Sequence, residues 1–332
     1  MTRFGAGLLL CLLASLGSVQ AAPAPHPHWS AGFHELSFLD PLDQQPMHAI
    51  AFYPSTAREQ SSLLGGYQID AAPEAQIAIG RFPLLMLSHG NTGTPLALHD
   101  LATSLARKGF VVVAVIHPGD NAQDHSRLGT LSNLYGRPIQ ISEAITATLN
   151  DPMLSPFVNA GQVGVIGYSA GGETALILSG ATPDLNRLRH YCQERPDDRD
   201  DLQPVSDPRV RALLLMAPLS LKFGRHTLAD VHVPVLLYSG DGDKLVAFDK
   251  NAAALARKLP TAPDFKTLAG AGHFVFLAPC TDEQIAAMPA LCTDADGVDR
   301  KDIHRTMISE ASRFFSDALG KSSRAGLRTA DQ

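Results

Sequence analysis

The sequence predicts a mixed α/β fold in which a mostly parallel central sheet is covered by helices on both faces. Three observations support this prediction. Continuous apolar and β-branched runs such as 110–120 (FVVVAVIHPGD) are typical of strands that are buried on both faces. Segments with helical spacing alternate with these runs, and that alternation specifies a parallel sheet. The 332 residues include 45% hydrophobic and 18% charged side chains, as expected for one sizeable globular core.

The overall charge argues against a nucleic-acid partner. The formal net charge is −6 at pH 7, and no basic stripe accompanies it. We therefore expect a small-molecule partner and no nucleic acid. The sequence does not indicate an oligomeric state.

The first residues have the pattern of a cleavable signal peptide. Arg3 precedes an apolar stretch, and small residues lead to a cleavage site after Ala21. The apolar stretch is interrupted by glycine and is shorter than the ~20 residues that a membrane span needs, so no stable span is expected. The protein is therefore predicted to be secreted or periplasmic. Residues 22–32 are proline-rich and are predicted to form an extended linker.

We expect a single domain over residues 33–320, followed by a flexible tail at 321–332. Two antiparallel strands open it at 33–40 and 47–54, because apolar and polar residues alternate there. Further strand runs are expected within 82–90, 110–120, 163–168, 210–220, 233–243 and 264–273. Helices are expected within 96–109, 141–151, 169–178, 248–259 and 304–319, from their 3.6-residue apolar spacing.

Two polar stretches fit neither strands nor helices of this pattern. Residues 181–208 are acidic and interrupted by proline, and residues 278–302 are similar. Because both lie between core elements, we interpret them as surface insertions. They could form a lid over a site or be solvated loops without a role.

Three cysteines remain after removal of the signal peptide, in a compartment that permits disulfides. Cys280 and Cys292 lie within one short polar stretch, so a bridge between them is the simplest pairing. Cys192 would then be free or bound elsewhere. Three unpaired thiols are the alternative.

A Gly-x-Ser-x-Gly pattern stands where an apolar strand is expected to turn into a helix. It occupies residues 167–171 (GYSAG) and places Ser169 in the turn. Gly167 and Gly171 are small enough for a tight, strained turn of this kind. The turn also places the Ser169 hydroxyl at a helix N-terminus, where negative charge is favoured. Ser169 is therefore the candidate nucleophile.

A serine nucleophile needs a base and a residue that orients the base. His273 lies in a loop of small residues after an expected strand, and Asp243 lies just past the end of another. The order Ser, Asp, His is the one expected for a nucleophile in such a turn. Asp241 competes with Asp243 for the role of the acid. The spacing Gly240-x-x-Asp243 favours Asp243.

An oxyanion formed by attack on a carbonyl needs two preorganised donors. The N–H of Ala170, directly after the nucleophile, is one candidate. The other is the N–H of Asn91, in the glycine-containing loop 87–93 (LSHGNTG) at the end of an earlier strand. Gly90 allows that loop to approach the nucleophile closely.

Five ordered motifs together resemble the α/β-hydrolase superfamily. Within it, they look like bacterial exported proteins of the dienelactone-hydrolase-like type, related to platelet-activating-factor acetylhydrolases. The motifs are LSHGNTG (87–93), FVVVAVIHPGDN (110–121), GYSAGG (167–172), VLLYSGDGD (235–243) and AGAGHFVFLAPC (269–280). The resemblance covers most of residues 33–318.

The resemblance implies an α/β-hydrolase fold and hydrolysis of carboxylic esters without a cofactor. It implies Ser169, Asp243 and His273 as the catalytic triad, and small or short-chain acyl esters as substrates. Dienelactone hydrolases proper use a cysteine nucleophile, so lactone specificity does not follow. The acetylhydrolases place their acid after the strand that follows the nucleophile helix, and residues 213–223 (LLLMAPLSLKF) offer none.

Two alternatives from other functional classes remain. A metal-dependent hydrolase could use His117, Asp120, Asp124 and His125, whose side chains suit a divalent ion although their spacing matches no ligand motif. A non-catalytic binding protein could be built on the same fold, because fold does not fix function. We expect no metal and an ester as the small-molecule partner.

Overall fold

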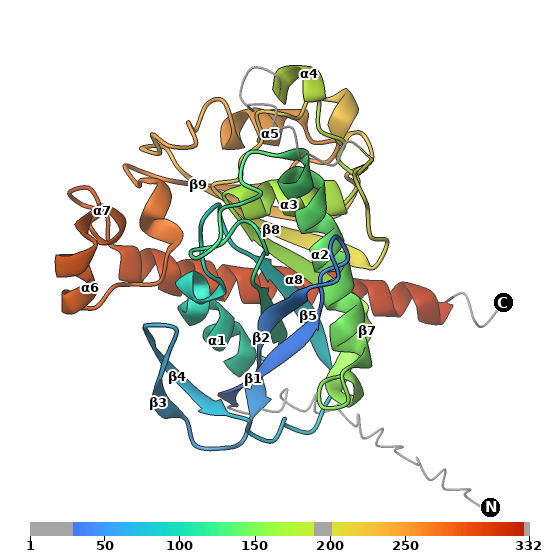
Figure 1. Ribbon diagram of the computed structural model, residues 1–332, viewed down its shortest axis with the longest axis vertical. Coiled ribbons are helices and arrows are strands. Elements are labelled where there is room, and N and C mark those ends of the chain that lie inside the picture. Colours follow the sequence, from blue (N-terminus) through green and yellow to red (C-terminus); the bar gives the residue numbers. More distant parts are fainter. Residues whose placement is uncertain (1–28, 189–200, 329–332) are drawn as a thin grey trace, which may run out of the picture.

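The computed structural model describes residues 29–188 and 201–328 (Figure 1). Within these residues ten strands form one sheet in the order β10-β9-β8-β7-β5-β6-β2-β1-β4-β3. The strands are β1 (Ser30–Leu39), β2 (Pro46–Ser55), β3 (Gln60–Leu64), β4 (Tyr67–Pro73), β5 (Phe82–Ser88), β6 (Val111–Val115), β7 (Val158–Tyr168), β8 (Val210–Met216), β9 (Val235–Gly240) and β10 (Asp264–Leu268). The α-helices are α1 (His99–Arg107), α2 (Leu131–Asn150), α3 (Ala170–Leu178), α4 (Leu185–Leu188), α5 (Ala252–Lys258), α6 (Asp282–Ala287), α7 (Pro289–Cys292) and α8 (Arg300–Arg328).

Six neighbouring strands of the sheet run parallel. β6, β5, β7, β8, β9 and β10 pair in parallel along the sheet, whereas β2 and β1 are antiparallel additions at the β6 side. The carboxyl ends of the six parallel strands therefore meet at one edge. The chain passes from β5 to β6 on one side and then continues with β7 on the other side of β5. Ligand sites of open α/β sheets lie at such a reversal.

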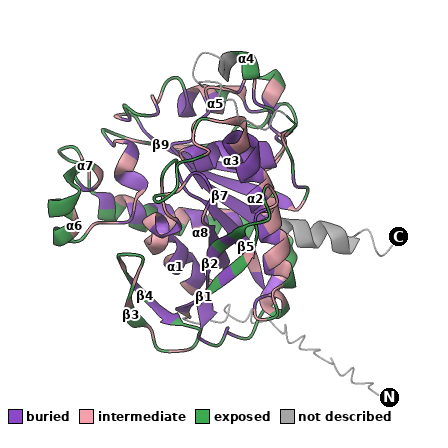
Figure 2. Cartoon of the chain, viewed as in Figure 1, coloured by how far each residue is buried: buried purple, intermediate pink, exposed green. Residues whose placement is uncertain are grey.

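Two hydrophobic cores cover the two faces of the sheet. Apolar side chains of α2, α3 and α5 pack on one face, and those of α1 and α8 pack on the other. Figure 2 shows buried residues concentrated in the strands and in the helix faces turned toward them. The predicted mostly parallel sheet with helices on both faces is confirmed.

The ends of the domain differ from the prediction. β1 begins at Ser30, so the last residues of the expected linker 22–32 belong to the sheet. Trp29 also packs edge-on against Phe82, with ring centroids 5.2 Å apart. At the other end, α8 continues to Arg328 and includes much of the segment expected as a flexible tail. The predicted signal peptide lies outside the described residues.

The β3–β4 hairpin was not predicted, and helix α2 was predicted too short. β3 and β4 form a hairpin whose Gly65 and Gly66 both have positive φ, as tight two-residue turns require. α2 begins at Leu131, ten residues before the expected start. The side chain of Thr130 caps its N-terminus, and the helix continues through Pro138 despite the missing N–H of that residue.

Among the described residues, no helix combines the length and the apolar character that crossing a membrane requires.

Candidate active site

Ser169 lies in the turn between β7 and α3. β7 ends at Tyr168 and α3 begins at Ala170, so the turn consists of this single residue. Ser169 has φ 54° and ψ −115°, which is strained for a residue with a side chain. Its N–H donates to the Met216 carbonyl and its own carbonyl accepts from the Leu219 N–H, both at 2.9 Å. These bonds to the end of β8 hold the strained turn in place.

Close backbone contacts explain the two glycines beside Ser169. A Cβ on Gly167 would lie 2.3 Å from the carbonyl oxygen of Gly171. A Cβ on Gly171 would lie 1.9 Å from the carbonyl oxygen of Ser88, the last residue of β5. A larger residue therefore fits at neither position. The second contact also brings the start of α3 directly against the end of β5.

Three side chains from separate strand ends meet at this turn. His273 Nε2 lies 3.0 Å from Ser169 Oγ, and His273 Nδ1 lies 2.6 Å from Asp243 Oδ2. Asp243 follows β9 and His273 follows β10, two neighbouring parallel strands. Their side chains are almost fully buried, so water does not compete for these hydrogen bonds. The structure thus brings together the three residues selected from the sequence.

Asp243 faces the imidazole, whereas Asp241 does not. Asp243 Oδ1 accepts from the backbone N–H groups of residues 245–246 at 2.9 and 2.8 Å, which leaves Oδ2 for His273. Asp241 is exposed, and its Oδ1 accepts from the Gly270 N–H at 2.6 Å. Asp241 therefore links two loops and is not positioned to orient the imidazole.

The loop that carries His273 is held from two sides. The Tyr168 hydroxyl donates to the His273 carbonyl at 3.1 Å, and burial raises the pKa of Tyr168, so that it remains a donor. From α8, His304 Nε2 donates to the Val275 carbonyl at 2.8 Å, while its Nδ1 lies 2.5 Å from Asp100 Oδ2. Neither His304 nor Asp100 stands in a recognisable sequence motif. Their pairing depends on the packing of α8 against α1.

Both backbone amides expected to bind an oxyanion lie beside the turn. The Ala170 N–H is the first of α3 and has no acceptor within the helix. Asn91 follows β5, which pairs with β7. A Cβ on Gly90 would lie 3.1 Å from Ser169 Cβ, so this loop packs directly on the serine. The Asn91 N–H donates to no acceptor in residues 29–188 and 201–328 and is therefore available to a substrate oxygen.

The four residues considered for a metal site are engaged elsewhere. His117 is bonded through both ring nitrogens to uncharged side chains, and Asp120 pairs with Arg137. Asp124 accepts from backbone N–H groups, and His125 is exposed. Across the described part of the chain, no group of three or more His, Cys, Asp or Glu side chains has an arrangement suited to a metal ion. These contacts give no support to a metal site formed by the four residues.

The predicted disulfide is confirmed. Cys280 and Cys292 are bonded, with their Cα atoms 5.8 Å apart. The bridge closes a segment that contains α6 and α7, within the predicted insertion 278–302, of which the last residues belong to α8. Cys192 lies outside the described residues.

A groove of about 690 Å³ lies beside the loop that follows β5, and Gly93 of that loop lines it. Residues 93–96 form one wall and the tip of the β3–β4 hairpin, residues 64–67, forms another. Gln284 and Met288 of the disulfide-closed segment contribute a third. The insertion therefore helps to shape a cavity next to the loop that carries the Asn91 amide.

Comparisons with known proteins support the fold. No protein-family model and no curated protein matches the sequence. Among 836 matching chains of solved structures is a ferulic acid esterase from Streptomyces cinnamoneus. The two chains are 20% identical with a TM-score of 0.63, and the match covers 91% of this chain and 93% of that chain. This likeness shows that the chain has the predicted α/β-hydrolase fold. The narrower resemblance to the dienelactone-hydrolase-like group stays a prediction.

Proposed function

We propose that the protein is a serine hydrolase that cleaves carboxylic esters through an acyl-enzyme intermediate. The observation that carries the proposal is the chain of hydrogen bonds from Asp243 through His273 to Ser169 Oγ. A serine hydroxyl is a weak nucleophile at its ordinary pKa. A base within hydrogen-bond reach, itself oriented by a third group, is the arrangement that activates it.

In the first half-reaction, Ser169 Oγ attacks the ester carbonyl carbon while His273 Nε2 takes the hydroxyl proton. Asp243 accepts from His273 Nδ1–H and so maintains the tautomer whose Nε2 lone pair faces Oγ. The bond from the carbonyl carbon to the alcohol oxygen then breaks, and the imidazolium gives its proton to that oxygen. The products are a free alcohol and an ester of Ser169.

In the second half-reaction, water attacks the carbonyl carbon of this ester. His273 takes a proton from the water and returns it to Ser169 Oγ as the acyl bond breaks. The free acid leaves and the starting state is restored. This cycle needs no group besides the triad, the oxyanion donors and water.

Each tetrahedral intermediate carries negative charge on the former carbonyl oxygen. The N–H groups of Ala170 and Asn91 are the donors we assign to it. In a comparable hydrolase the loss of one such donor costs ~3 to 4 kcal/mol of transition-state stabilisation. The start of α3 adds partial positive charge at the same place.

Small or short-chain acyl esters are the substrates we propose first. The solved structure described as a ferulic acid esterase supports ester chemistry on this fold. The groove that Gly93 and Met288 help to line is large enough for a larger acyl or alcohol group, although none of the triad residues lines it. Chain length is therefore the first variable to test.

The proposal is tested with a panel of nitrophenyl esters of increasing acyl length and a hydroxycinnamate ester, using the wild type and Ser169→Ala. We expect turnover of at least the short-chain esters, and a loss of about 10⁶-fold in kcat for the variant. Turnover that survives in Ser169→Ala would relocate the nucleophile. A wild type that turns over no ester of the panel would favour the non-catalytic binding protein.

We also propose that the chain is exported and that its signal peptide is removed after Ala21. The Cys280–Cys292 disulfide supports this, because such bridges persist in oxidising compartments. Intact-mass measurement of the protein recovered from the periplasm and medium of an expressing bacterium tests it. A mature chain that starts at Ala22 is expected, whereas a chain that retains Met1 would contradict cleavage.

A further inference from the structure

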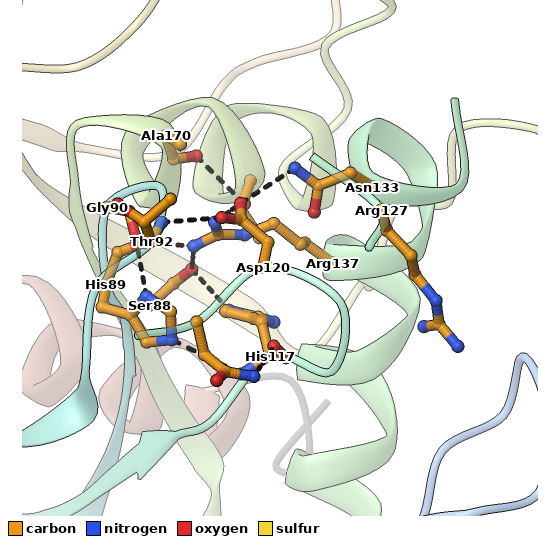
Figure 3. Close-up of polar contacts among 12 residues, drawn as sticks. Ser88, His89, Gly90, Thr92, His117, Asp120, Arg127, Asn133, Arg137 and Ala170 are labelled. Atoms are coloured by element: carbon orange, nitrogen blue, oxygen red, sulfur yellow. Dashed lines mark hydrogen bonds and ion pairs between the residues drawn. The ribbon is translucent and has the colours of Figure 1, made fainter. Parts of the chain in front are cut away.

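A second polar cluster lies beneath the loop that carries Asn91. Figure 3 shows it joining the end of β5 to helix α2 and to the loop after β6. None of its side chains takes part in the proposed reaction. We call it the Arg137 cluster, and its members are Ser88, His89, His117, Asp120, Asn133 and Arg137.

Arg137 reaches this cluster from α2 and is only 3% exposed. Its guanidinium donates through Nη1 to Asp120 Oδ2 at 2.7 Å. Through Nη2 it donates to the backbone carbonyl of His89 and to Ser88 Oγ (Figure 3). A single buried cation thus holds both the side chain and the backbone of the segment in which β5 ends.

Asp120 connects Arg137 to Thr92, at the other end of loop 88–93. Its Oδ1 accepts from the backbone N–H of Thr92 at 2.7 Å, and its Oδ2 also accepts from Asn133 Nδ2 at 2.8 Å. Thr92 has φ 53°, an unfavourable value for a β-branched residue. The charged hydrogen bond from Asp120 helps to maintain this strained residue.

The orientation of the Asn91 N–H follows from these anchors. The Gly90 carbonyl accepts from His89 Nδ1 at 2.7 Å and from the Gly93 N–H at 3.1 Å, so it points back into its own loop. In a planar trans peptide, the C=O and the next N–H point in opposite directions. The Asn91 N–H therefore points away from the interior of that loop, and Gly90, the residue before it, packs against Ser169.

Both histidines of the cluster are uncharged in this hydrogen-bond pattern. Gln140 Nε2 donates to Asp40, so Gln140 Oε1 accepts from His117 Nδ1–H. His117 Nε2 then accepts from the Ser88 hydroxyl. The backbone N–H of His117 points at Nε2 of His89, which leaves His89 Nδ1 as the donor to its own loop. Burial and the nearby guanidinium lower the pKa of both rings.

We propose that Arg137 is a positioning residue that fixes the Asn91 amide as an oxyanion donor, an inference that rests on the proposed function. Arg137 anchors the carbonyl of His89 directly and the N–H of Thr92 through Asp120. These two groups flank the Gly90–Asn91 peptide. Stability alone does not account for such a pair, because replacing a buried ion pair by well-packed apolar residues is often neutral or stabilising.

Arg137→Met tests the proposal, because it removes the bond to the His89 carbonyl, leaves Asp120 without its cation, and keeps an unbranched apolar side chain in the buried position. We expect kcat for the best ester to fall by about 100-fold or more, with KM changed by less than about threefold, since the oxyanion exists only after attack. Arg137→Lys keeps a cation near Asp120, but a single ammonium cannot reproduce the two separate donors that Arg137 directs to Asp120 and to the His89 carbonyl. Its kcat should lie between those of the wild type and Arg137→Met.

Arg209→Met is the matched control. Arg209 pairs with Asp207 and binds α2 through Ser142 and Thr146, but it precedes β8 and so lies at the opposite edge of the sheet. We expect this variant to lose thermal stability while its kcat stays within about threefold of the wild type. Thermal unfolding midpoints of all variants identify the assay temperature at which each is folded. If Arg137→Met does not fold, Arg137→Lys decides the matter.

Amide hydrogen exchange provides a readout that does not depend on turnover. Exchange of residues 88–93 should accelerate in the Arg137 variants, while that of residues 241–246 and 270–276 should not. Unchanged exchange at 88–93, or a loss of kcat no larger than in Arg209→Met, would overturn the proposal. If the wild type hydrolyses no ester, the proposed function fails, whereas the exchange result still decides whether Arg137 holds the loop.

Discussion

Two loops lie against Ser169, and different chemistry holds each of them. Loop 88–93, which carries the proposed oxyanion donor, is anchored by the guanidinium of Arg137, which stays charged across the working pH range of enzymes. Loop 270–276, which carries the proposed base His273, is anchored by the imidazole of His304. One side of the site is thus held by a fixed charge and the other by a titratable one.

The His304 anchor requires a protonated ring. The Asp100 carboxylate and the Val275 carbonyl are both acceptors, so both ring nitrogens must donate. Burial alone would lower the pKa of His304, but the hydrogen bond and charge of Asp100, together with the Val275 carbonyl, raise it overall. The charge of Arg300 on α8 opposes this rise, and His99 lies beside Asp100 on α1.

The histidines of the Arg137 cluster behave in the opposite way. Burial, followed by the charge of Arg137, lowers the pKa of His89 to about 3 and that of His117 well below its usual value. Near pH 6 the unfolded chain therefore binds protons on these two rings, whereas the folded chain does not. Stability supplied by this region is lost as the pH falls below about 6.5, the unfolded pKa of histidine.

Loop 270–276, with the proposed base His273, should respond strongly to a change at Asp243. Asp243→Asn should lower kcat by about 10⁴-fold, because an amide at this place favours the wrong imidazole tautomer. Asp241→Asn is the control, since it touches only the link to Gly270, and its kcat should stay within about threefold. Steady-state kinetics of both variants measure this. A greater loss in Asp241→Asn would make Asp241 the acid.

The stability of the protein at acidic pH tests whether the histidines of the Arg137 cluster are uncharged. Between about pH 6 and 5, each of His89 and His117 should reduce the free energy of unfolding by about 1.4 kcal/mol per pH unit. Urea unfolding at several pH values measures the slope. His117→Gln removes one titrating ring and should lose about half of it. A free energy of unfolding that does not change over this interval would mean that these rings are protonated in the folded protein.

A third prediction concerns the alkaline side of the pH range, where the His304 ring loses its charge. The folded pKa of His304 lies above the unfolded value, so its stabilisation is complete below about pH 6.5 and is lost as the pH rises through the folded pKa. At pH 6, His304→Gln should be less stable by about 1.5 to 3 kcal/mol, the range for hydrogen bonds of charged groups. The difference should shrink at pH 9. Chemical denaturation at both values measures it, and a constant difference would contradict a charged anchor.

Local motifs were sufficient to predict which three side chains lie together at the turn after β7. Ser169 is marked by the small residues around it, and the bridge from Cys280 to Cys292 by the short segment between the two cysteines. His273 and Asp243 each follow a strand run, and parallel strands bring such ends to one edge of the sheet. Residues that directly follow predicted parallel strands can therefore be identified from the sequence alone, because their position in the fold is set by the strand ends.

The supports of the site were not predicted, because their partners are distant in the sequence. His304 and its partner Asp100 are 204 residues apart in the sequence, and Arg137 is 48 residues from His89, whose carbonyl it binds. Pro138 also concealed the helix that carries Arg137, since proline usually ends a helix. The β3–β4 hairpin did carry a local signal, the two glycines 65–66, but its strands are short and partly polar.

The central claim is that Ser169 is a nucleophile activated by His273. The most direct test is reaction of the purified protein with a fluorophosphonate, followed by peptide mass spectrometry. We predict one phosphonylated residue, Ser169, with labelling abolished in Ser169→Ala and slowed by at least 100-fold in His273→Gln. An unlabelled wild type, a label on another residue, or labelling as fast in His273→Gln as in the wild type would contradict the claim.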